Sequence, residues 1–527
     1  MQVENGKGGK PAAGSVPSGV ALLSQPLELP CGRVAPNRLV KAPMEEMMGH
    51  FGGSAPTERI LRLYRHWAKS QWGIIITGNV CVDSTHLGLP FDMALPEPPF
   101  LENEDLVKRF KAYAKVCKGI EGESSTSTGN KPLAIVQLVH AGRQSLRGSG
   151  RAPWKPSLAP SAIPMKTAKD LGVVGKPLDW LLWGVPSAMT VDQIHWLIQR
   201  FADASQLMAA AGFDGVELHA SHGYQLAAFL SPRTNTRTDA YGGSSRNRAR
   251  LLLEMVEAVR AKVPRDFAVG VKLNSSDYIQ GGLTEEDALE NVKWLAETGM
   301  CDFVEVSGGN YENPSFLTDG FDADAETAKL KGQKQEQASI ENKASVKVSD
   351  RTRKREALFA TFAKRARGVL PQGSGMKIIV TGGLRTRGGM ASALETGAID
   401  GVGIGRPACV HPDLPDYILN ASVADSDEAH ASPPAYTVPG AGVLGLLPIK
   451  ILGAGWQTLW HNGMLAYLGQ DEAAKPDTSA GPLRVLLAIF VPSLFATRSG
   501  AGAAGVFAVL GSLVAAAVGS VLFLVMK

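Results

Sequence analysis

The sequence predicts an α/β fold: a (β/α)8 TIM barrel over residues 21–425, followed by a C-terminal extension and a single transmembrane helix. Two observations predict the barrel. Short apolar runs alternate with longer amphipathic segments eight times, as expected for parallel strands that are each followed by a helix. Glycine-rich turns also follow the last two strands, where such barrels bind their ligands. A third observation, an uncharged C-terminal tail, predicts the membrane helix.

The eight expected strands are mostly continuous apolar runs, which are typical of strands buried on both faces. They lie within residues 37–44, 73–79, 134–140, 215–224, 267–273, 302–306, 377–381 and 400–404. Helices are expected where apolar residues recur with helical spacing, often after an N-cap residue. They cover residues 56–67, 104–118, 191–211, 245–263, 284–297, 354–367 and 387–396. Thr284, for example, precedes three acidic residues, which favour a helix start.

Several polar segments lie outside this alternation. Residues 1–20 predict a disordered leader, and the Ser/Thr tract at 124–129 predicts a surface insertion. The Pro/Gly/Ser-rich stretch 141–187 is long for a loop in a compact domain, which indicates an active-site wall or lid. Residues 312–352 are polar and charged, so we expect a second excursion over the site.

The composition excludes several classes of protein. Of the 527 residues, 44% are hydrophobic and 20% are charged, which is typical of a globular protein with a core. The net charge is only +4 and no basic stripe occurs, so we expect no nucleic-acid partner. The five cysteines lack paired spacing, which indicates reduced thiols in a cytosolic environment and neither a zinc site nor an iron–sulfur cluster. The amino end lacks the apolar core of a signal peptide.

The strand within 215–224 ends in three side chains that can donate hydrogen bonds: His219, His222 and Tyr224. Ligands of α/β folds bind at the carboxyl ends of strands. A His-x-x-His pair can also bind a metal, but that site would need a further ligand and no metal motif stands nearby. Alone, the stretch fits either a catalytic or a structural role.

Glycine-rich turns follow the last two expected strands. Thr381-Gly382-Gly383-Leu384-Arg385 comes after one, and Gly403-Ile404-Gly405-Arg406 comes at the end of the other. In TIM barrels the loops after strands seven and eight commonly bind phosphate, because glycine lets backbone N–H groups approach the anion closely. Either turn could be structural, but the two together predict a phosphate site.

Four sequence blocks occur in an order that points to one family. They are Asn-Arg-Leu-Val-Lys-Ala-Pro-Met (37–44), Gln-Leu-Val-His-Ala-Gly-Arg-Gln (137–144), Gly-Phe-Asp-Gly-Val-Glu-Leu-His-Ala-Ser-His-Gly-Tyr (212–224) and Phe-Leu-Ser-Pro-Arg-Thr-Asn-Thr-Arg-Thr-Asp-Ala-Tyr-Gly-Gly-Ser (229–244). The chain resembles, over nearly all of 25–420, the Old Yellow Enzyme-like NADH:flavin oxidoreductases. The resemblance implies FMN as cofactor and NADH or NADPH as hydride donor.

The resemblance also implies which residues bind FMN. The backbone around Ala42, Pro43, Met44 and Gly78 would contact the isoalloxazine, and Gln137 would hydrogen-bond its pyrimidine edge. Lys272 stands where the family often has arginine, beside flavin N1 and O2, where a cation stabilises the anionic reduced flavin. The phosphate would be held by Gly382, Gly383, Gly405 and Arg406.

The same resemblance assigns the catalytic residues. His219 and His222 would donate hydrogen bonds to the substrate's carbonyl oxygen, as an oxyanion hole does. Tyr224 would deliver a proton to the α-carbon as general acid, since phenols ordinarily have a pKa of about 10. NAD(P)H would reduce FMN and leave, and the activated alkene would then take a hydride from flavin N5.

Glu45 departs from the family pattern, because well-studied members carry threonine or cysteine at this position, near flavin O4. A carboxylate there would raise the energy of reduced flavin, or stay protonated, or point elsewhere. The direction of the reaction is therefore open.

The C-terminal region predicts an extension and linker at 426–482, an apolar interfacial or re-entrant segment at 483–498 and a transmembrane helix at 499–526. Two arginines precede the span and one lysine follows it, so we expect the barrel in the cytosol.

We therefore expect a membrane-anchored, FMN-dependent NAD(P)H oxidoreductase that reduces the C=C bond of a hydrophobic α,β-unsaturated carbonyl compound. Two alternatives stay open: an FMN-barrel dehydrogenase or oxidase of another small substrate, and a non-catalytic flavin-binding membrane scaffold. The sequence also leaves open whether the chain is a homo-oligomer.

Overall fold

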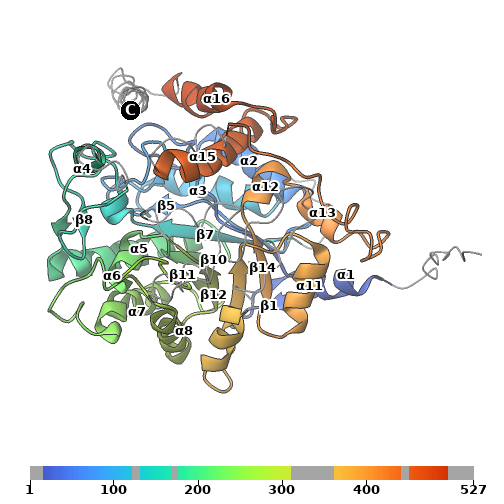
Figure 1. Ribbon diagram of the computed structural model, residues 1–527, viewed down its shortest axis with the longest axis horizontal. Helices are drawn as coiled ribbons and strands as arrows, with labels where there is room; N and C mark the ends of the chain where they lie inside the picture. Colours follow the sequence, from blue (N-terminus) through green and yellow to red (C-terminus); the bar gives the residue numbers. More distant parts are fainter. Residues whose placement is uncertain are drawn as a thin grey trace, which may run out of the picture.

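The computed structural model describes residues 16–121, 131–167, 175–309, 312, 361–440 and 450–495. Within these residues, eight parallel strands form one closed barrel (Figure 1). In order around it they are β3 (Leu39–Lys41), β4 (Ile74–Ile76), β7 (Leu133–Val139), β10 (Gly215–Ala220), β11 (Ala268–Asn274), β12 (Phe303–Ser307), β13 (Lys377–Thr381) and β14 (Gly401–Ile404). The barrel closes because β10 pairs with both β7 and β11, and β14 pairs with β3. The predicted barrel is therefore present.

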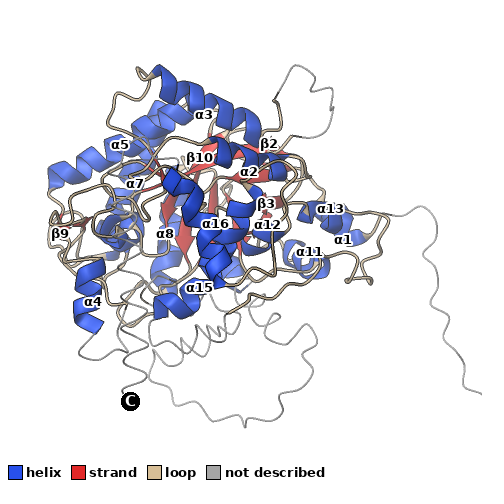
Figure 2. Cartoon of the chain, turned by 90° about the horizontal axis from the view of Figure 1, so that it is seen from above, coloured by secondary structure: helices blue, strands red, loops and turns tan. Residues whose placement is uncertain are grey.

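Helices surround this barrel, as the view from above shows (Figure 2). They include α2 (Glu58–Ala68), α3 (Glu104–Cys117), α5 (Val191–Ala210), α7 (Ser245–Lys262), α8 (Glu285–Thr298) and α11 (Arg387–Glu395), together with residues 361–369. Each of the six labelled helices begins after a side chain that accepts a backbone N–H of its first turn. Each also buries one apolar face; in α2, for example, Ile60, Leu63 and Trp67 are buried.

Shorter elements extend this framework. Two strands, β5 (Val80–Cys81) and β6 (Met93–Ala94), add to the barrel sheet at β7. The long loop after β7 contains η1 (Gly142–Gln144), β8 (Leu158–Ala159), α4 (Gly175–Leu182) and β9 (Ser187–Ala188), and α6 (Gln225–Leu230) follows β10.

The barrel interior has an apolar floor below a polar layer. Because alternate residues of a strand point inward, Ile135, Ala268 and Phe303 share one buried cluster near the amino ends of the strands. A hairpin of β1 (Leu27–Glu28) and β2 (Val34–Ala35) adds further apolar side chains to this cluster. Further along four of the strands lie buried polar side chains, Gln137, Glu217, Lys272 and Glu305, beneath the mouth of the barrel.

The C-terminal extension covers the barrel rather than leaving it. The short helices α12 (Arg406–Val410) and α13 (Leu414–Ile418) follow the last strand, and α15 (Lys450–Leu468) and α16 (Pro482–Phe495) come after residue 425. Helix α15 packs against α2 and α12, and α16 packs against α15 (Figures 1 and 2). Trp460 anchors the pair, since its side chain is fully buried and its Nε1 donates to Ala480 O over 3.2 Å.

The prediction of a transmembrane helix needs correction. Among the helices of the described ranges, none combines the length and the apolar character that a bilayer crossing requires. Helix α16 has 14 residues, a rise of about 21 Å against a hydrocarbon core of about 30 Å. Its apolar side chains Val485, Ile489 and Phe490 are buried against the protein, whereas Leu483 and Leu487 are exposed. We therefore withdraw the single-pass anchor, the membrane partner and the membrane localisation.

Other expectations fall outside the described residues. They are the span at 499–526, most of the leader at 1–20, the Ser/Thr tract at 124–129 and nearly all of the excursion at 312–352. Residues 18–20 of the expected leader belong to helix α1 (Ser18–Leu23), which is held in place because Gly19 N donates to Asp425 Oδ2 over 2.9 Å.

Candidate active site

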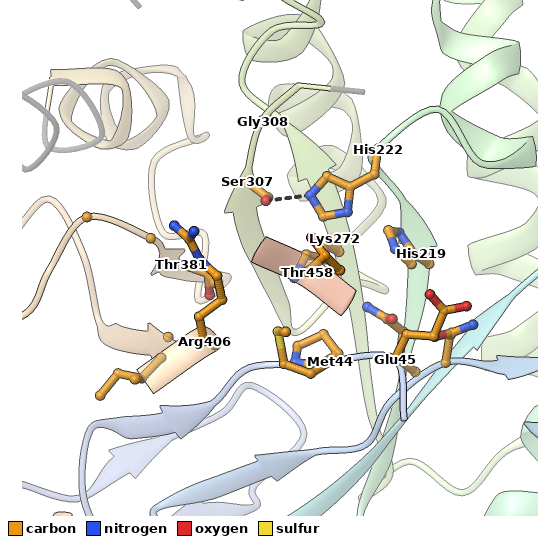
Figure 3. Close-up of a pocket in the computed structure, with 18 of the residues that line it drawn as sticks. Met44, Glu45, His219, His222, Lys272, Ser307, Gly308, Thr381, Arg406 and Thr458 are labelled. Carbon is orange, nitrogen blue, oxygen red and sulfur yellow. Dashed lines mark hydrogen bonds between the residues drawn. The ribbon is translucent and has the colours of Figure 1, made fainter. Parts of the chain in front are cut away.

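A cavity opens at the carboxyl ends of the barrel strands, between the strand ends and α15. Its walls combine glycine-rich turns, four imidazole or phenol rings and several charged side chains (Figure 3). The lining residues are Pro43, Met44, Glu45, Asn79, Gln137, His219, His222, Tyr224, Lys272, Tyr278, Ser307, Gly308, Thr381, Gly382, Gly383, Leu384, Arg385, Gly403, Ile404, Gly405, Arg406, Pro407 and Thr458. Thr381 and Arg406 lie on one side of the close-up, and Glu45, His219 and His222 lie on the other.

The three rings predicted to be catalytic lie together on one wall. The His219 and His222 ring centroids are 5.2 Å apart, and those of His219 and Tyr224 are 4.7 Å apart, both in edge-to-face orientation. His219 points inward because it lies two residues after Glu217 on β10, while His222 and Tyr224 lie on the turn between β10 and α6. One strand end therefore supplies all three groups.

The turn that presents His222 is held by side chains of other elements. His222 has φ 59°, an uncommon value for a residue with a side chain. Its backbone N–H donates to Asn274 Oδ1 over 3.1 Å, and its carbonyl oxygen accepts from Gln144 Nε2 over 2.9 Å. Its Nε2 lies 2.8 Å from Ser307 Oγ. These contacts fix the imidazole at the end of β12.

Both imidazoles are neutral at physiological pH. Burial lowers the pKa of His219 well below its usual range, and the charges of His222 and Lys272 lower it further. Burial, together with Lys272, lowers the pKa of His222 to about 3. The Nδ1 of His219 accepts the backbone N–H of Ser221, which places the ring proton on Nε2. His219 is therefore a neutral hydrogen-bond donor.

The polar layer beneath the cavity is formed by four side chains. Gln137 Nε2 donates to Glu217 Oε1, and Lys272 Nζ donates to Glu305 Oε1, each over 2.7 Å. Burial and the neighbouring Glu305 raise the pKa of Glu217 well above its usual range. Burial acts to raise the pKa of Glu305, but Lys272 and Glu217 lower it overall. The layer therefore combines a neutral Glu217 with an ion pair between Lys272 and Glu305.

Glu45 forms a second carboxyl pair, with Asp92. Burial raises the pKa of Glu45 well above its usual range, and the charge of Asp92 raises it further. Burial raises the pKa of Asp92 to about 6. Glu45 Oε1 and Asp92 Oδ1 have no hydrogen-bond donor among the described residues, and a proton shared between the carboxyls satisfies both. Burial and Asp92 therefore favour the protonated form of the Glu45 carboxyl group, the second of the three possibilities that the sequence left open.

The opposite side of the cavity is rich in glycine and positively charged. Gly382 and Gly383 have φ of 112° and 85°, which side chains rarely allow. A methyl group at Gly403 would lie 1.7 Å from Thr381 Oγ1. Arg385 and Arg406 line the same side, and Arg406 Nη1 donates to Gln457 Oε1 over 2.7 Å.

Comparison with known proteins agrees with this arrangement. The sequence model described as the NADH:flavin oxidoreductase / NADH oxidase family matches residues 23–312. The chain is 35% identical over 412 residues to the NADH-dependent flavin oxidoreductase iliE of Hypocrea jecorina (strain QM6a), covering 78% of this chain and 92% of that protein. The chain belongs to this family.

Two further similarities bear on length and fold. The iliE protein of Neonectria sp. (strain DH2) is 38% identical over 392 residues, which are 74% of this chain but only 46% of that protein. The Old Yellow Enzyme homologue from Zymomonas mobilis has the same fold, with a TM-score of 0.55 at 21% identity over 78% of this chain and 97% of that one.

The flavoenzyme therefore depends on FMN and a nicotinamide reductant, as the sequence predicts, and the cavity residues fit FMN. One side offers two guanidinium groups and glycine backbone, which suit a phosphate dianion. The buried hydroxyl oxygen of Thr458 lines the cavity without a hydrogen-bond partner among the described residues. Polar atoms left in this way are expected where a polar ligand binds.

Two of the predicted FMN-binding residues do not line the cavity. Ala42 N donates to Ile404 O within the barrel, and Gly78 N donates to Glu46 Oε1 and to Tyr64 Oη. A methyl group at Gly78 would lie 2.1 Å from Glu46 Oε2, so this glycine makes room for a buried carboxyl group. The cavity lining instead contains their neighbours Pro43 and Asn79. The other nine predicted cofactor residues all line it.

The sequence patterns did not predict several residues of the site. Ser307 and Thr381 are the last residues of β12 and β13, a position that could have drawn attention to them. Glu217 and Glu305 are inward-facing by strand alternation, but nothing local indicates that they meet. Thr458 lies in a helix with no sequence signal for a role in the site.

A second polar cluster lies behind Tyr224. His86 Nδ1 is 2.7 Å and His140 Nε2 is 3.3 Å from Asp83 Oδ2. The outer nitrogens of both rings accept backbone N–H groups, of Leu158 and Gly142, so both inner nitrogens carry protons directed at the carboxylate. A metal-binding imidazole normally donates its outer N–H instead. His86 is therefore hydrogen-bonded to Asp83, and the His140 ring lies beside the same carboxylate, so the three residues form a buried polar brace.

Proposed function

We propose that the flavoenzyme reduces the C=C bond of α,β-unsaturated carbonyl compounds. The observation that carries the proposal is the contact between the His219, His222 and Tyr224 rings in a cavity whose other side fits a phosphate. FMN, when bound there, supplies the hydride that NAD(P)H delivers to it.

The two imidazoles bind and polarise the carbonyl group. As neutral rings they donate hydrogen bonds without bringing a charge into the buried site. A carbonyl oxygen that accepts from both becomes a stronger acceptor as negative charge develops on it, which lowers the barrier to attack at the β-carbon. Ser307 and Asn274 keep His222 in place for this task.

Tyr224 supplies the proton. Its ring is buried against His219 and an apolar group formed by Cys81, Leu87 and Val139, so water has little access to it. Its hydroxyl is the proton donor for the α-carbon, while the imidazoles hold the oxygen.

The test is an anaerobic spectroscopic titration of the FMN-loaded protein and its Tyr224→Phe variant. NADH should bleach the flavin in both. Addition of 2-cyclohexen-1-one should restore the oxidised spectrum of the wild type, and the variant should recover about 100-fold more slowly, because general acids contribute factors of about 100 to 10,000.

Tyr241→Phe is the matched control. Its hydroxyl donates to Glu254 Oε2 over 2.8 Å and does not line the cavity, so this variant should recover like the wild type. A flavin that NADH bleaches but no enone restores would contradict the proposal and favour a dehydrogenase or oxidase. A flavin that NADH does not bleach would favour a non-catalytic flavin-binding protein.

A further inference from the structure

Helix α15 lies outside the barrel but reaches the cofactor cavity. It packs against α2 and against α12, the short helix that begins at Arg406. Thr458, near the middle of the helix, lines the cavity together with residues at the ends of all eight barrel strands and in the turns that follow them. Figure 3 shows Thr458 within the ring of lining side chains. The extension is therefore part of the cavity wall.

The Thr458 hydroxyl group is buried without a hydrogen-bond partner among the described residues. Its Oγ1 is buried, yet it makes no hydrogen bond with any described residue. A buried hydroxyl left without a hydrogen bond is destabilising, so such groups normally have a protein, water or ligand partner. Since Thr458 lines the cavity, a ligand in that cavity can supply the partner.

The neighbouring residue Gln457 acts on the same cavity from outside. Its Oε1 accepts from Arg406 Nη1 over 2.7 Å. Arg406 follows Gly405 and lines the glycine-rich side of the cavity, where the phosphate fits. Gln457 therefore limits the positions that this guanidinium can take.

We propose that α15 completes the FMN site. The Thr458 hydroxyl hydrogen-bonds to bound FMN, and Gln457 is a positioning residue that holds Arg406 for the phosphate. The family model ends at residue 312, so neither residue belongs to the part of the chain that it matches. The inference rests on FMN binding alone and does not depend on which substrate the enzyme reduces.

The first test measures FMN affinity. Apoprotein is titrated with FMN, and the flavin fluorescence gives the dissociation constant. Thr458→Val keeps the shape of the side chain but removes the hydroxyl, and it should weaken FMN binding about tenfold, the effect of one buried hydrogen bond. Thr458→Ser keeps the hydroxyl and should bind within about twofold of the wild type.

The second test separates Gln457 from a general packing effect. Gln457→Leu should weaken FMN binding but leave riboflavin binding unchanged, because riboflavin has no phosphate for Arg406 to hold. Gln457→Glu restores an acceptor for Arg406 and should recover FMN affinity. Melting temperatures of the apoproteins show whether each variant is folded.

Two results would overturn the proposal for Thr458: wild-type FMN affinity in Thr458→Val, or an equal loss in Thr458→Ser. An equal loss of FMN and riboflavin binding in Gln457→Leu would overturn the positioning role. If a variant does not fold, hydrogen exchange is measured on the wild-type protein instead. Added FMN should then slow the exchange of the backbone amides of residues 456–466. Unchanged exchange there would also contradict the proposal.

Discussion

Two carboxyl groups near the cavity keep their protons for the same physical reason. Glu45 lies next to Asp92, and Glu217 lies next to Glu305. Both pairs are buried away from solvent, which disfavours two adjacent negative charges. In each pair one carboxyl is neutral and can donate to the other. A glutamic acid at position 45 therefore brings a hydrogen-bonding group to the cavity without bringing a negative charge.

Glu45→Gln tests this assignment through stability. Burial and Asp92 raise the folded-state pKa of Glu45 above the unfolded value of 4.5, so above pH 4.5 the unfolded chain releases a proton that the folded protein retains. This difference costs stability as pH rises. Glutamine has no proton to release and can donate to Asp92, so the apoprotein variant should gain about 1–3 °C in melting temperature over wild type between pH 5 and pH 8.

The control for this prediction is Glu102→Gln, which changes an exposed side chain in the turn before α3. Its melting temperature should follow the wild type at every pH. A Glu45→Gln difference that stays constant from pH 5 to pH 8 would show that Glu45 is ionised in the folded protein.

The catalytic rings could be assigned from the sequence because they are close along the chain. His219, His222 and Tyr224 follow one strand, so strand geometry brings them together. The carboxyl pairs could not be predicted, because their partners come from different strands or loops and only the tertiary structure brings them into contact. Local patterns carry no information about such pairs.

At the scale of elements, β14 shows how tightly the barrel is built around the cofactor cavity. Gly403 faces Thr381 across the β13–β14 pair, and a Cβ there would lie 1.7 Å from Thr381 Oγ1 and 2.9 Å from Thr381 Cβ. Neither strand can move away freely, because each is paired on its other side as well.

Gly403→Ala should therefore displace Thr381 and the glycine turn that follows it. We expect the FMN dissociation constant to rise at least tenfold and the melting temperature of the apoprotein to fall. Gly368→Ala is the matched control, since a methyl group there meets no atom within 4 Å and should leave FMN binding unchanged. Wild-type affinity in Gly403→Ala would show that the turn after β13 does not contact the cofactor.

The sequence predicts a strand or helix well where its residue pattern is compatible with only one structure. The run Ile74–Ile76 is buried on both faces, which is what a continuous apolar strand indicates. The capping box of Thr284 and Asp287 marks the start of α8 as expected. Helix α15 is different, because an apolar, tryptophan-containing helix looks the same whether it covers a barrel or lies at a membrane.

At the scale of the whole molecule, that ambiguity explains why the apolar sequence at 483–498 predicts an interfacial or re-entrant segment. The apolar side chains of α16 pack against α15 and the barrel; Phe490, for instance, lies 5.9 Å from Phe91 between ring centroids. Covering the barrel mouth needs an apolar segment, and hydropathy cannot tell this requirement from membrane insertion. The extension thus belongs to the same folded unit as the cofactor cavity.

The central claim is that the His219 and His222 imidazoles, at the end of β10, lie in the same cavity as FMN and bind the carbonyl group of the substrate that FMN reduces. Its most direct test uses the His219→Ala variant, photoreduced without NADH and mixed anaerobically with either 2-cyclohexen-1-one or ferricyanide in a stopped-flow spectrometer. Removing one preorganised donor should slow re-oxidation by the enone about 100-fold. Re-oxidation by ferricyanide, which has no carbonyl group, should stay at the wild-type rate. An enone rate equal to that of the wild type would contradict the account.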